Sequence, residues 1–264
     1  MSQLLSSPSN IWLTGASSGI GEALVHELAG AGHKLIVTGR RQEPLDELLQ
    51  TFPNQIAAAA ADTTSKNDLQ GVKSQLDHFG DLDMVILNAG TCEYLDARHF
   101  DIDLVERVLT TNLHGTLYAV DAALPLLRRA RDVHRRPQLA AVSSASAYFP
   151  LPRAEAYGAS KAAISYFLAS LRLDLAAEGI DVSLIHPGFV RTPLTERNDF
   201  PMPMRVEVDE AVEAILRGLE KRSLDIHFPR RFTWLVKLAG ILPPVLRHRL
   251  GLRLTRNADT EGCS

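Results

Sequence analysis

The sequence predicts a doubly wound α/β fold, a parallel sheet covered by helices on both faces. Short runs of Ile, Val, Leu and Ala alternate with helical patterns of ten or more residues along most of the chain, which is typical of strand–helix–strand crossovers. A cluster of glycines follows the first apolar run, where such folds turn sharply into the first helix. With 264 residues and 45% hydrophobic content, the chain has enough apolar side chains to form one large core.

The expected elements follow one another in a regular order. Strands are expected at residues 11–14, 34–38, 56–61, 83–87, 139–143, 181–186 and 224–228, of which the alanine-rich third is the weakest signal. Helices are expected after the glycines and at 43–50, 65–79, 154–178 and 209–222, with a long helical stretch from the fourth strand to residue 130 that contains Pro125. Such sheets bind ligands at the carboxyl ends of their strands, so functional residues are expected just after strands.

Charge and cysteine content narrow the function classes. A net charge of −3 does not indicate nucleic acid as a partner. Cys92 and Cys263 match neither a metal-ligand spacing nor a disulfide framework, which predicts a reducing compartment and no metal site.

Targeting signals are not evident either. The polar first ten residues do not resemble a signal peptide, and no apolar run reaches the roughly 18–20 residues of a membrane span. We expect a single-domain cytoplasmic protein with a core at 10–229, a C-terminal extension at 230–256 and a disordered tail at 257–264.

The glycine cluster predicts a dinucleotide site. Gly15, Gly19 and Gly21 form T-G-x-x-x-G-x-G between the first strand and the first helix. Glycine permits the tight turn and lets the backbone approach a pyrophosphate, while the helix N-terminus offers free amide groups to the phosphates. The alternative is a glycine-rich turn without a ligand.

The end of the second strand favours NADP(H) over NAD(H). An acidic residue there would bind a ribose 2′-hydroxyl, whereas an arginine accommodates a 2′-phosphate. The strand ends in Gly39 followed by Arg40 and Arg41, and Ser17 could add a hydroxyl. The alternative is that both arginines are solvated surface charges.

A tyrosine and a lysine on one helix face suggest acid–base chemistry. Tyr157 and Lys161 are four residues apart in the helix expected at 154–178. A nearby ammonium is expected to lower the pKa of a phenol, and Ser144, just after the fifth strand, could hold a substrate oxygen. This tyrosine–lysine spacing also occurs often by chance.

Six ordered segments resemble the short-chain dehydrogenase/reductase family over about residues 10–229. They are T-G-A-S-S-G-I-G at 14–21, L-N-A-G at 87–90, Asn112, S-S at 143–144, Y-G-A-S-K at 157–161 and P-G-F-V-R-T at 187–192. The glycine spacing matches the shorter, single-domain branch. Leu87 stands where the family often has a second asparagine, a mainly structural position. The resemblance implies a seven-stranded Rossmann-type sheet in the order 3-2-1-4-5-6-7, with helices on both faces and a helical C-terminal extension.

The resemblance also implies residue roles. Tyr157 would be the general acid/base, Lys161 its pKa-lowering partner and ribose anchor, and Ser144 the group that orients the carbonyl. Asn112 would hold a helix distortion and a water in a proton relay behind Lys161. The residues implied to bind the cofactor are Gly15, Ser17, Ser18, Gly19, Ile20, Gly21, Arg40, Asp62, Asn88, Ala89, Gly90, Tyr157, Lys161, Pro187, Gly188, Val190 and Thr192.

Some of these residues have finer implied positions. Asp62 would meet the adenine amino group, although it could instead cap a helix, and Thr192 would lie near the nicotinamide carboxamide. Ser143 is interpreted as packing, and His186 as a strand-end residue rather than a catalytic base.

Two regions bear on the substrate. Residues 194–204 contain F-P-M-P-M, and in the family that this chain resembles the corresponding stretch is a lid over the substrate. The apolar character of the segment suggests an apolar substrate. The alternative is a packed loop without substrate contact. Tyr94, Phe149 and Leu151 could line the same pocket.

The second region is the C-terminal extension and the residues just before it. Residues 221–256 carry nine Lys/Arg against one acid, Asp225, interleaved with Trp and Leu. A helix covering the pocket or an oligomer contact is favoured over membrane-surface contact through 230–256.

The function expected is an NADP(H)-dependent reductase of a small-molecule carbonyl, or the reverse oxidation of a secondary alcohol, in a homodimer or homotetramer. The alternatives are a non-catalytic NADP(H)-binding regulator and a membrane-associated scaffold. A non-catalytic protein would have little use for Tyr157, Lys161, Ser144 and Asn112 together.

Overall fold

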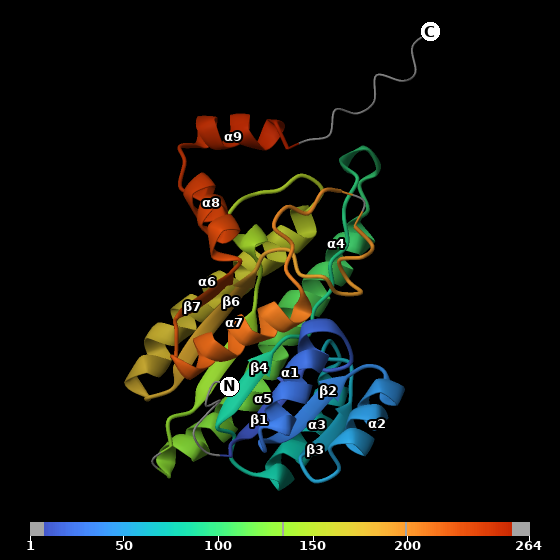
Figure 1. Ribbon diagram of the computed structural model, residues 1–264, viewed down its shortest axis with the longest axis vertical. Helices are drawn as coiled ribbons and strands as arrows, with labels where there is room; N and C mark the ends of the chain where they lie inside the picture. The colour runs from blue at the N-terminus through green and yellow to red at the C-terminus, as the bar shows by residue number, and fades with distance from the viewer. Residues whose placement is uncertain (1–7, 134, 199, 255–264) are drawn as a thin grey trace.

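The computed structural model describes residues 8–133, 135–198 and 200–254, and within them the chain forms a seven-stranded parallel sheet (Figure 1). The strand order is β3-β2-β1-β4-β5-β6-β7, as expected. The strands are β1 (Asn10–Thr14), β2 (Lys34–Gly39), β3 (Ile56–Ala60), β4 (Met84–Leu87), β5 (Gln138–Val142), β6 (Asp181–Pro187) and β7 (Asp225–Phe228). Each begins and ends within one residue of its expected bounds.

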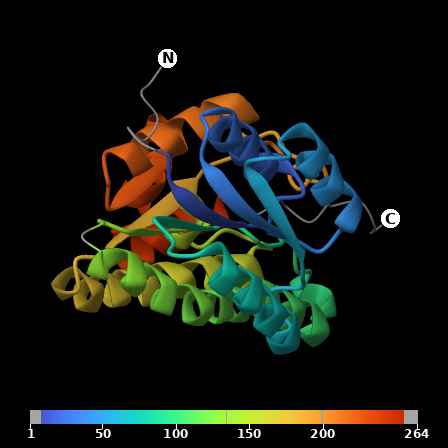
Figure 2. The same ribbon diagram turned by 90° about the horizontal axis from the view of Figure 1, so that it is seen from below.

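Helices cover both faces of this sheet (Figure 2). They are α1 (Gly19–Gly30), α2 (Gln42–Thr51), α3 (Lys66–Phe79), α4 (Ile102–Leu109), α5 (Gly115–Asp132), α6 (Glu155–Ala177), α7 (Val208–Glu220), α8 (Arg230–Gly240) and α9 (Pro244–Leu252). Helices α1, α2 and α7 pack on one face, and α3, α5 and α6 pack on the other.

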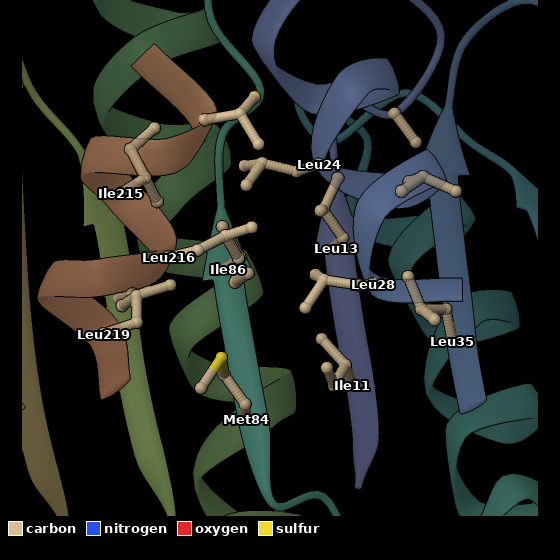
Figure 3. Packing of buried hydrophobic residues seen from close by; sticks show 14 of the residues in the cluster. Ile11, Leu13, Leu24, Leu28, Leu35, Met84, Ile86, Ile215, Leu216 and Leu219 are labelled. Atoms are coloured by element: carbon tan, nitrogen blue, oxygen red, sulfur yellow. The ribbon is translucent and has the colours of Figure 1, made fainter. Parts of the chain in front are cut away.

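Side chains alternate across the strands and build a core on each face. Ile11 and Leu13 of β1 point toward α1, where they meet Leu24 and Leu28 (Figure 3). Trp12, between them, is buried on the opposite face, and its indole nitrogen donates a hydrogen bond to Thr38 Oγ1 at 3.0 Å. Because both faces are covered, the strands are continuous apolar runs rather than half-polar ones.

The long helical stretch before residue 130 has three parts. After a 3₁₀ turn, η1 (Ala97–His99), α4 leads into a single π-turn, η2 (Thr110–His114), and then into α5, which contains Pro125. The extension forms α8 and α9; the tail expected to be disordered, 257–264, lies outside the described residues. No helix in the described part of the chain is both long enough and apolar enough to cross a bilayer.

The strand order places the loops that carry the sequence motifs at one edge of the sheet. Strand β1 lies between β2 and β4, with Thr14 beside Thr38 and Leu87, so the loops that follow these strands are neighbours. Because all strands are parallel, the segments after β5, β6 and β7 emerge at the same edge.

Candidate active site

The glycine loop lies tightly against the end of β4. Gly15 has φ +71°, and a Cβ there would be 2.7 Å from the Cα of Ala89. A Cβ on Gly21 would overlap the carbonyl oxygen of Gly15. Asn88 fixes the same oxygen, because its Nδ2 donates to it at 2.9 Å. Only glycine fits the backbone at these two positions.

The N-terminus of α1 is open to a ligand. Its N-cap, Ser18, is extended and makes no side-chain hydrogen bond to the first turn, so the leading amide groups are available to an anion. Gly19, with φ +58°, lies against the side chain of Thr192, and Ile20 packs on the core beneath the loop.

A cleft of about 440 Å³ opens beside this loop on the side of β2 and β3. Arg40, Asp62 and Thr64 line it together with residues of α4 and η2. Asp62 Oδ1 accepts hydrogen bonds from the Thr64 amide and hydroxyl at 2.9 and 2.8 Å. The cap of α3 is Ser65, so the helix-cap alternative for Asp62 does not hold.

Donors for an anion gather at the end of β2. Arg41 Nη2 donates to the carbonyl oxygen of Ser17 at 2.8 Å, and the exposed Arg40 precedes it at the cleft. A Cβ on Gly39 would be 3.2 Å from Ser17 Oγ, so the serine hydroxyl lies at this strand end. The first residue after β2 is therefore an arginine beside a hydroxyl, not a carboxylate.

The loop after β4 contacts the end of β1 and lies close to Lys161 of α6. The amides of Asn88 and Ala89 donate to Thr14 Oγ1 at 3.1 and 3.2 Å. A Cβ on Gly90 would be 3.1 Å from Asn112 Oδ1 and 3.4 Å from Lys161 Nζ, so this glycine lies beside the catalytic candidates.

Ser144 and Tyr157 form a hydrogen-bonded pair at the end of β5. The amide of Ser146 donates to Ser144 Oγ at 3.1 Å, so that oxygen is already an acceptor. The Ser144 side chain hydrogen-bonds Tyr157 and acts to lower the pKa of that phenol.

The pKa values correct one expectation. Burial raises the pKa of Tyr157 above its ordinary value, the negative form of Cys92 raises it further, and Ser144 only partly opposes this. Lys161 does not produce the expected lowering in this arrangement: its Nζ donates to the Val142 carbonyl oxygen at 2.9 Å and lies 5.8 Å from the Tyr157 ring centroid. Burial lowers the pKa of Lys161 to about 8. At neutral pH Tyr157 is therefore a protonated phenol.

Asn112 joins the loop after β4 to α6. It lies in the π-turn η2 and is fully buried, and such a turn is the helix distortion that the resemblance implied. Its Oδ1 accepts from the Thr91 amide at 2.7 Å, and its Nδ2 donates to the Thr91 carbonyl oxygen and to Ser160 Oγ at 3.0 and 2.9 Å. Ser160 directly precedes Lys161, so this asparagine braces the catalytic turn.

The segment after β6 brings the C-terminal helix to the site. The Gly188 amide donates to the Phe228 carbonyl oxygen at 2.7 Å, and a Cβ on Gly188 would be 2.8 Å from the Phe232 ring. Pro187 and Val190 are buried, and Val190 forms a bridge with Val206.

Four aromatic residues, Tyr94, Phe189, Phe200 and Phe232, form a linked aromatic wall, and its member Tyr94 lies near Tyr157. Phe200 meets the Tyr94 ring edge-on at 5.2 Å, and Phe189 lies 6.0 Å from Phe200 and 5.4 Å from Phe232. Tyr94 and Phe200 were candidates from the sequence, whereas Phe189 and Phe232 were not. Phe189 stands inside the P-G-F-V-R-T segment, so its position was a usable signal.

Sequence reasoning also missed Cys92 as a site residue. Its negative form raises the pKa of Tyr157, and its side chain hydrogen-bonds Tyr94, so it lies between the two phenols. Cys92 follows N-A-G by two residues, which was the available signal. Of the other pocket candidates, Phe149 is buried and Leu151 half-buried.

A polar network behind the site links α6 to α8. Ser143 Oγ donates to the Lys161 carbonyl oxygen at 2.9 Å and lies 2.7 Å from Ser165 Oγ. His186 continues the chain, with Nε2 at 3.1 Å from Ser165 Oγ and Nδ1 at 2.8 Å from Asp225 Oδ1. Ser143 and His186 therefore support the turn that carries Lys161, in line with their interpretation as structural residues.

Comparisons with known proteins bear on the family of the chain. The family model for short chain dehydrogenases matches residues 9–201. An uncharacterized oxidoreductase of Myxococcus xanthus is 33% identical over 250 residues, which cover 92% of this chain and 96% of that protein. The 11-beta-hydroxysteroid dehydrogenase-like 3 protein of Arabidopsis thaliana is 30% identical over 251 residues, 91% of this chain and 79% of its own.

A solved structure is similar to this chain in both fold and sequence. The short-chain dehydrogenase from Sphingobium yanoikuyae in complex with NADPH is 27% identical, with a TM-score of 0.75 over 96% of this chain and 98% of that one. The family model alone covers well over half of the sequence, and the relatives extend the match to nearly all of it. The chain therefore belongs to the short-chain dehydrogenase/reductase family of oxidoreductases.

Proposed function

We propose that this protein is an NADP(H)-dependent oxidoreductase that interconverts an apolar ketone or aldehyde and the corresponding alcohol. The observation that carries the proposal is the Ser144–Tyr157 pair, which lies beside Lys161, with Lys161 Nζ 5.8 Å from the Tyr157 ring centroid and next to Gly90 of the loop after β4. A proton donor, a second hydroxyl and an ammonium group thus meet at the edge of the sheet where a dinucleotide would lie.

The chain's own groups supply the acid–base part of the reaction. Tyr157, protonated at neutral pH, would give its phenolic proton to the carbonyl oxygen. The Ser144 hydroxyl, next to Tyr157, would hold that oxygen, and the Lys161 ammonium would stabilise the negative charge that develops. A nicotinamide cofactor bound at this edge supplies the hydride. Asn112, through Ser160, keeps the lysine turn in place.

The residues present fit a dinucleotide with a 2′-phosphate. Gly15 and Gly21 leave no room for a Cβ, and the N-terminus of α1 is uncapped, as a pyrophosphate site requires. Arg40, Arg41 and Ser17 supply donors at the end of β2, which supports NADP(H) over NAD(H). The Sphingobium relative, solved with NADPH, supports the same cofactor.

The aromatic wall supports an apolar substrate. Phe189, Phe200 and Phe232 are linked ring to ring, and Phe200 contacts Tyr94, which lies near Tyr157. The similarity to a plant protein named for steroid dehydrogenases supports the same class, because steroids are apolar ring systems. We further infer a homodimer or homotetramer, a state that exposed apolar side chains such as Tyr166 and Leu173 on α6 support.

Substitution of the proposed acid tests the chemistry. Tyr157→Phe should lower kcat for ketone reduction by about 10²- to 10⁴-fold while NADPH binding changes little, because only the transferred proton is removed. Stopped-flow or steady-state NADPH oxidation with a panel of apolar ketones measures this. Tyr166→Phe, an exposed tyrosine on the same helix, is the matched control. Near-full turnover in Tyr157→Phe contradicts the proposed role, and NADPH binding without turnover in the unsubstituted protein favours a regulator.

Substitution of Arg40 tests the cofactor. Arg40→Ala should raise the Kd for NADPH by about 10- to 100-fold, because one charge-assisted hydrogen bond is lost, and leave the Kd for NADH unchanged. Calorimetry or cofactor fluorescence measures both constants. Arg217→Ala, an arginine on α7 that pairs with Glu213, is the control. Equal effects on the two cofactors would contradict a phosphate contact.

A further inference from the structure

Helix α8 has two faces with different surroundings. On its inner face Phe232 packs against Phe189 and Gly188, and Thr233 is fully buried. On its outer face four large apolar side chains are solvent-exposed at three- and four-residue spacing: Trp234 49%, Leu235 59%, Leu238 53% and Ile241 79%. The covering role expected of the extension therefore falls mainly to the inner face. On the outer face the Trp234 ring meets His227 edge-on at 5.7 Å, while the four side chains stay about half or more exposed.

Helix α9 continues this exposed surface. It stands beyond α8, at the end of the molecule away from the rest of the sheet and its helices (Figure 1). None of its nine residues is buried, and Val245 and Leu246 are 64% and 48% exposed. We call Trp234, Leu235, Leu238, Ile241, Val245 and Leu246 the outer apolar face.

The segment that carries the outer apolar face is basic. Residues 226–254 contain no Asp or Glu, and their basic side chains are Arg230, Arg231, Lys237, Arg247, Arg249 and Arg253. Lys237 is neutralised by Asp225 at 2.6 Å, which leaves an excess of positive charge on the rest. The chain as a whole carries −3, so this segment opposes the charge of the molecule.

The positive charge and the exposed apolar side chains of this segment together indicate which kind of partner it fits. A second copy that presents the same segment would bring positive charge against positive charge, and a nucleic acid would leave the exposed Leu and Ile side chains in water. An anionic lipid surface pairs with the arginines through its headgroups and takes up the apolar side chains below them. We propose that α8 and α9 form a docking face that binds the protein to anionic membranes.

The placement of this face relates it to the active site. The same helix that presents Trp234 and Leu235 outward presents Phe232 to the aromatic wall. Docking would thus bring the substrate side of the cleft to the lipid surface, where apolar substrates concentrate. Binding itself requires no turnover, so the docking proposal and the proposed chemistry fail independently.

Vesicle flotation of the full chain tests the proposal. Vesicles of phosphatidylcholine with about 30% phosphatidylserine should carry the protein at about 0.05 M salt, and binding should fall several-fold at about 0.5 M salt, where surface charge is screened. Vesicles of phosphatidylcholine alone should bind at least about tenfold less protein. Equal binding to both kinds of vesicle, or to neither, overturns the proposal.

Paired variants separate the two contributions. Leu235→Ser with Leu238→Ser should weaken binding at least about tenfold, because two apolar side chains no longer enter the interface. Ile102→Ser with Leu224→Ser, two exposed apolar side chains elsewhere, should bind like the unsubstituted protein. Arg249→Gln with Arg253→Gln should weaken binding by about tenfold or more, whereas Lys34→Gln with Lys73→Gln, the same change in net charge, should not.

Two further measurements test whether a variant binds vesicles less because its folding or its oligomeric state has changed. Thermal unfolding followed by circular dichroism should give the same midpoint for each variant and its control, since all of these side chains are exposed. Light scattering without vesicles should give the same mass for the unsubstituted protein and the leucine pair. A lower mass for Leu235→Ser with Leu238→Ser would identify the face as a contact between copies and overturn membrane docking.

Discussion

The two sides of the proposed active site, a cofactor side at the glycine loop and a substrate side at the aromatic wall, are held together by different kinds of contact. On the cofactor side, backbone atoms and small side chains meet directly: Asn88 Nδ2 holds the carbonyl oxygen of Gly15, and Gly15 fits against Ala89 with no space for a Cβ. On the substrate side, Phe200 and Phe232 are brought together through Phe189 from distant parts of the chain. Both kinds of contact join segments that are apart in the sequence, but the first joins two short motifs, 14–21 and 87–90, that the sequence already identifies, whereas the second joins aromatic side chains outside any such pair of motifs.

The largest effect is expected on the cofactor side, from Gly21→Ala. The new Cβ would overlap the Gly15 carbonyl oxygen and crowd Asn88 Nδ2, so the backbone of the loop must move. We expect a loss of about 2–4 kcal/mol in the free energy of unfolding and at least about a 100-fold rise in the Kd for NADPH. Chemical denaturation and calorimetry measure the two quantities.

A glycine without such neighbours provides the control. Gly71 lies inside α3, and a Cβ there would meet nothing within 4 Å. Gly71→Ala should therefore stabilise the protein by about 0.5–1 kcal/mol, since alanine is the better helix former, and leave NADPH binding unchanged. If Gly21→Ala behaves like Gly71→Ala, the close packing of the glycine loop does not hold the cofactor side together.

A smaller and more selective effect is expected on the substrate side, from Phe200→Ala. The substitution removes the ring that joins Tyr94 to Phe189 and leaves the glycine loop untouched. We expect the KM for an apolar ketone to rise about tenfold, while the Kd for NADPH stays the same. Phe100→Ala, an exposed phenylalanine outside the wall, is the matched control. An equal rise in the Kd for NADPH would show that the two halves are not separable.

The same difference explains how far the sequence could predict the site. Strands and glycine turns can be predicted from local patterns in the sequence. The strand order and the candidate site residues were implied by the ordered motifs. Asn88 and Asn112 could therefore be named in advance, and Thr14 stands within a quoted segment. The contacts of Phe232 could not, because they depend on where α8 returns after β7. The sequence also could not predict that the pKa of Tyr157 is raised. The four-residue spacing between Tyr157 and Lys161 is visible in the sequence, but the burial of Tyr157 and the hydrogen bond from Lys161 Nζ to the Val142 carbonyl oxygen are not.

The smallest expected effect concerns Asp225, which ties the substrate side to the extension. Burial opposes its ionisation, but hydrogen bonds from His186 and Lys237, reinforced by their charges, outweigh burial and hold the pKa of Asp225 well below its ordinary value. Tyr148 donates to the same carboxylate at 3.1 Å. A depressed carboxyl pKa contributes stability that is present above the unfolded value of about 3.9 and is lost as pH falls toward the folded pKa.

Asp225→Asn should therefore lower the free energy of unfolding at pH 7 by about 1 kcal/mol, a modest figure because the carboxylate is partly exposed to solvent. The difference from the unsubstituted protein should shrink below about pH 4, where the native carboxylate begins to lose its charge advantage. Denaturation curves at a series of pH values measure this difference. Asp174→Asn, an exposed aspartate on α6, should show no such difference at any pH. A gap between Asp225→Asn and the unsubstituted protein that stays constant into acid would mean that Asp225 acts by packing, and that α8 is held by contacts such as the one between Phe232 and Phe189 alone.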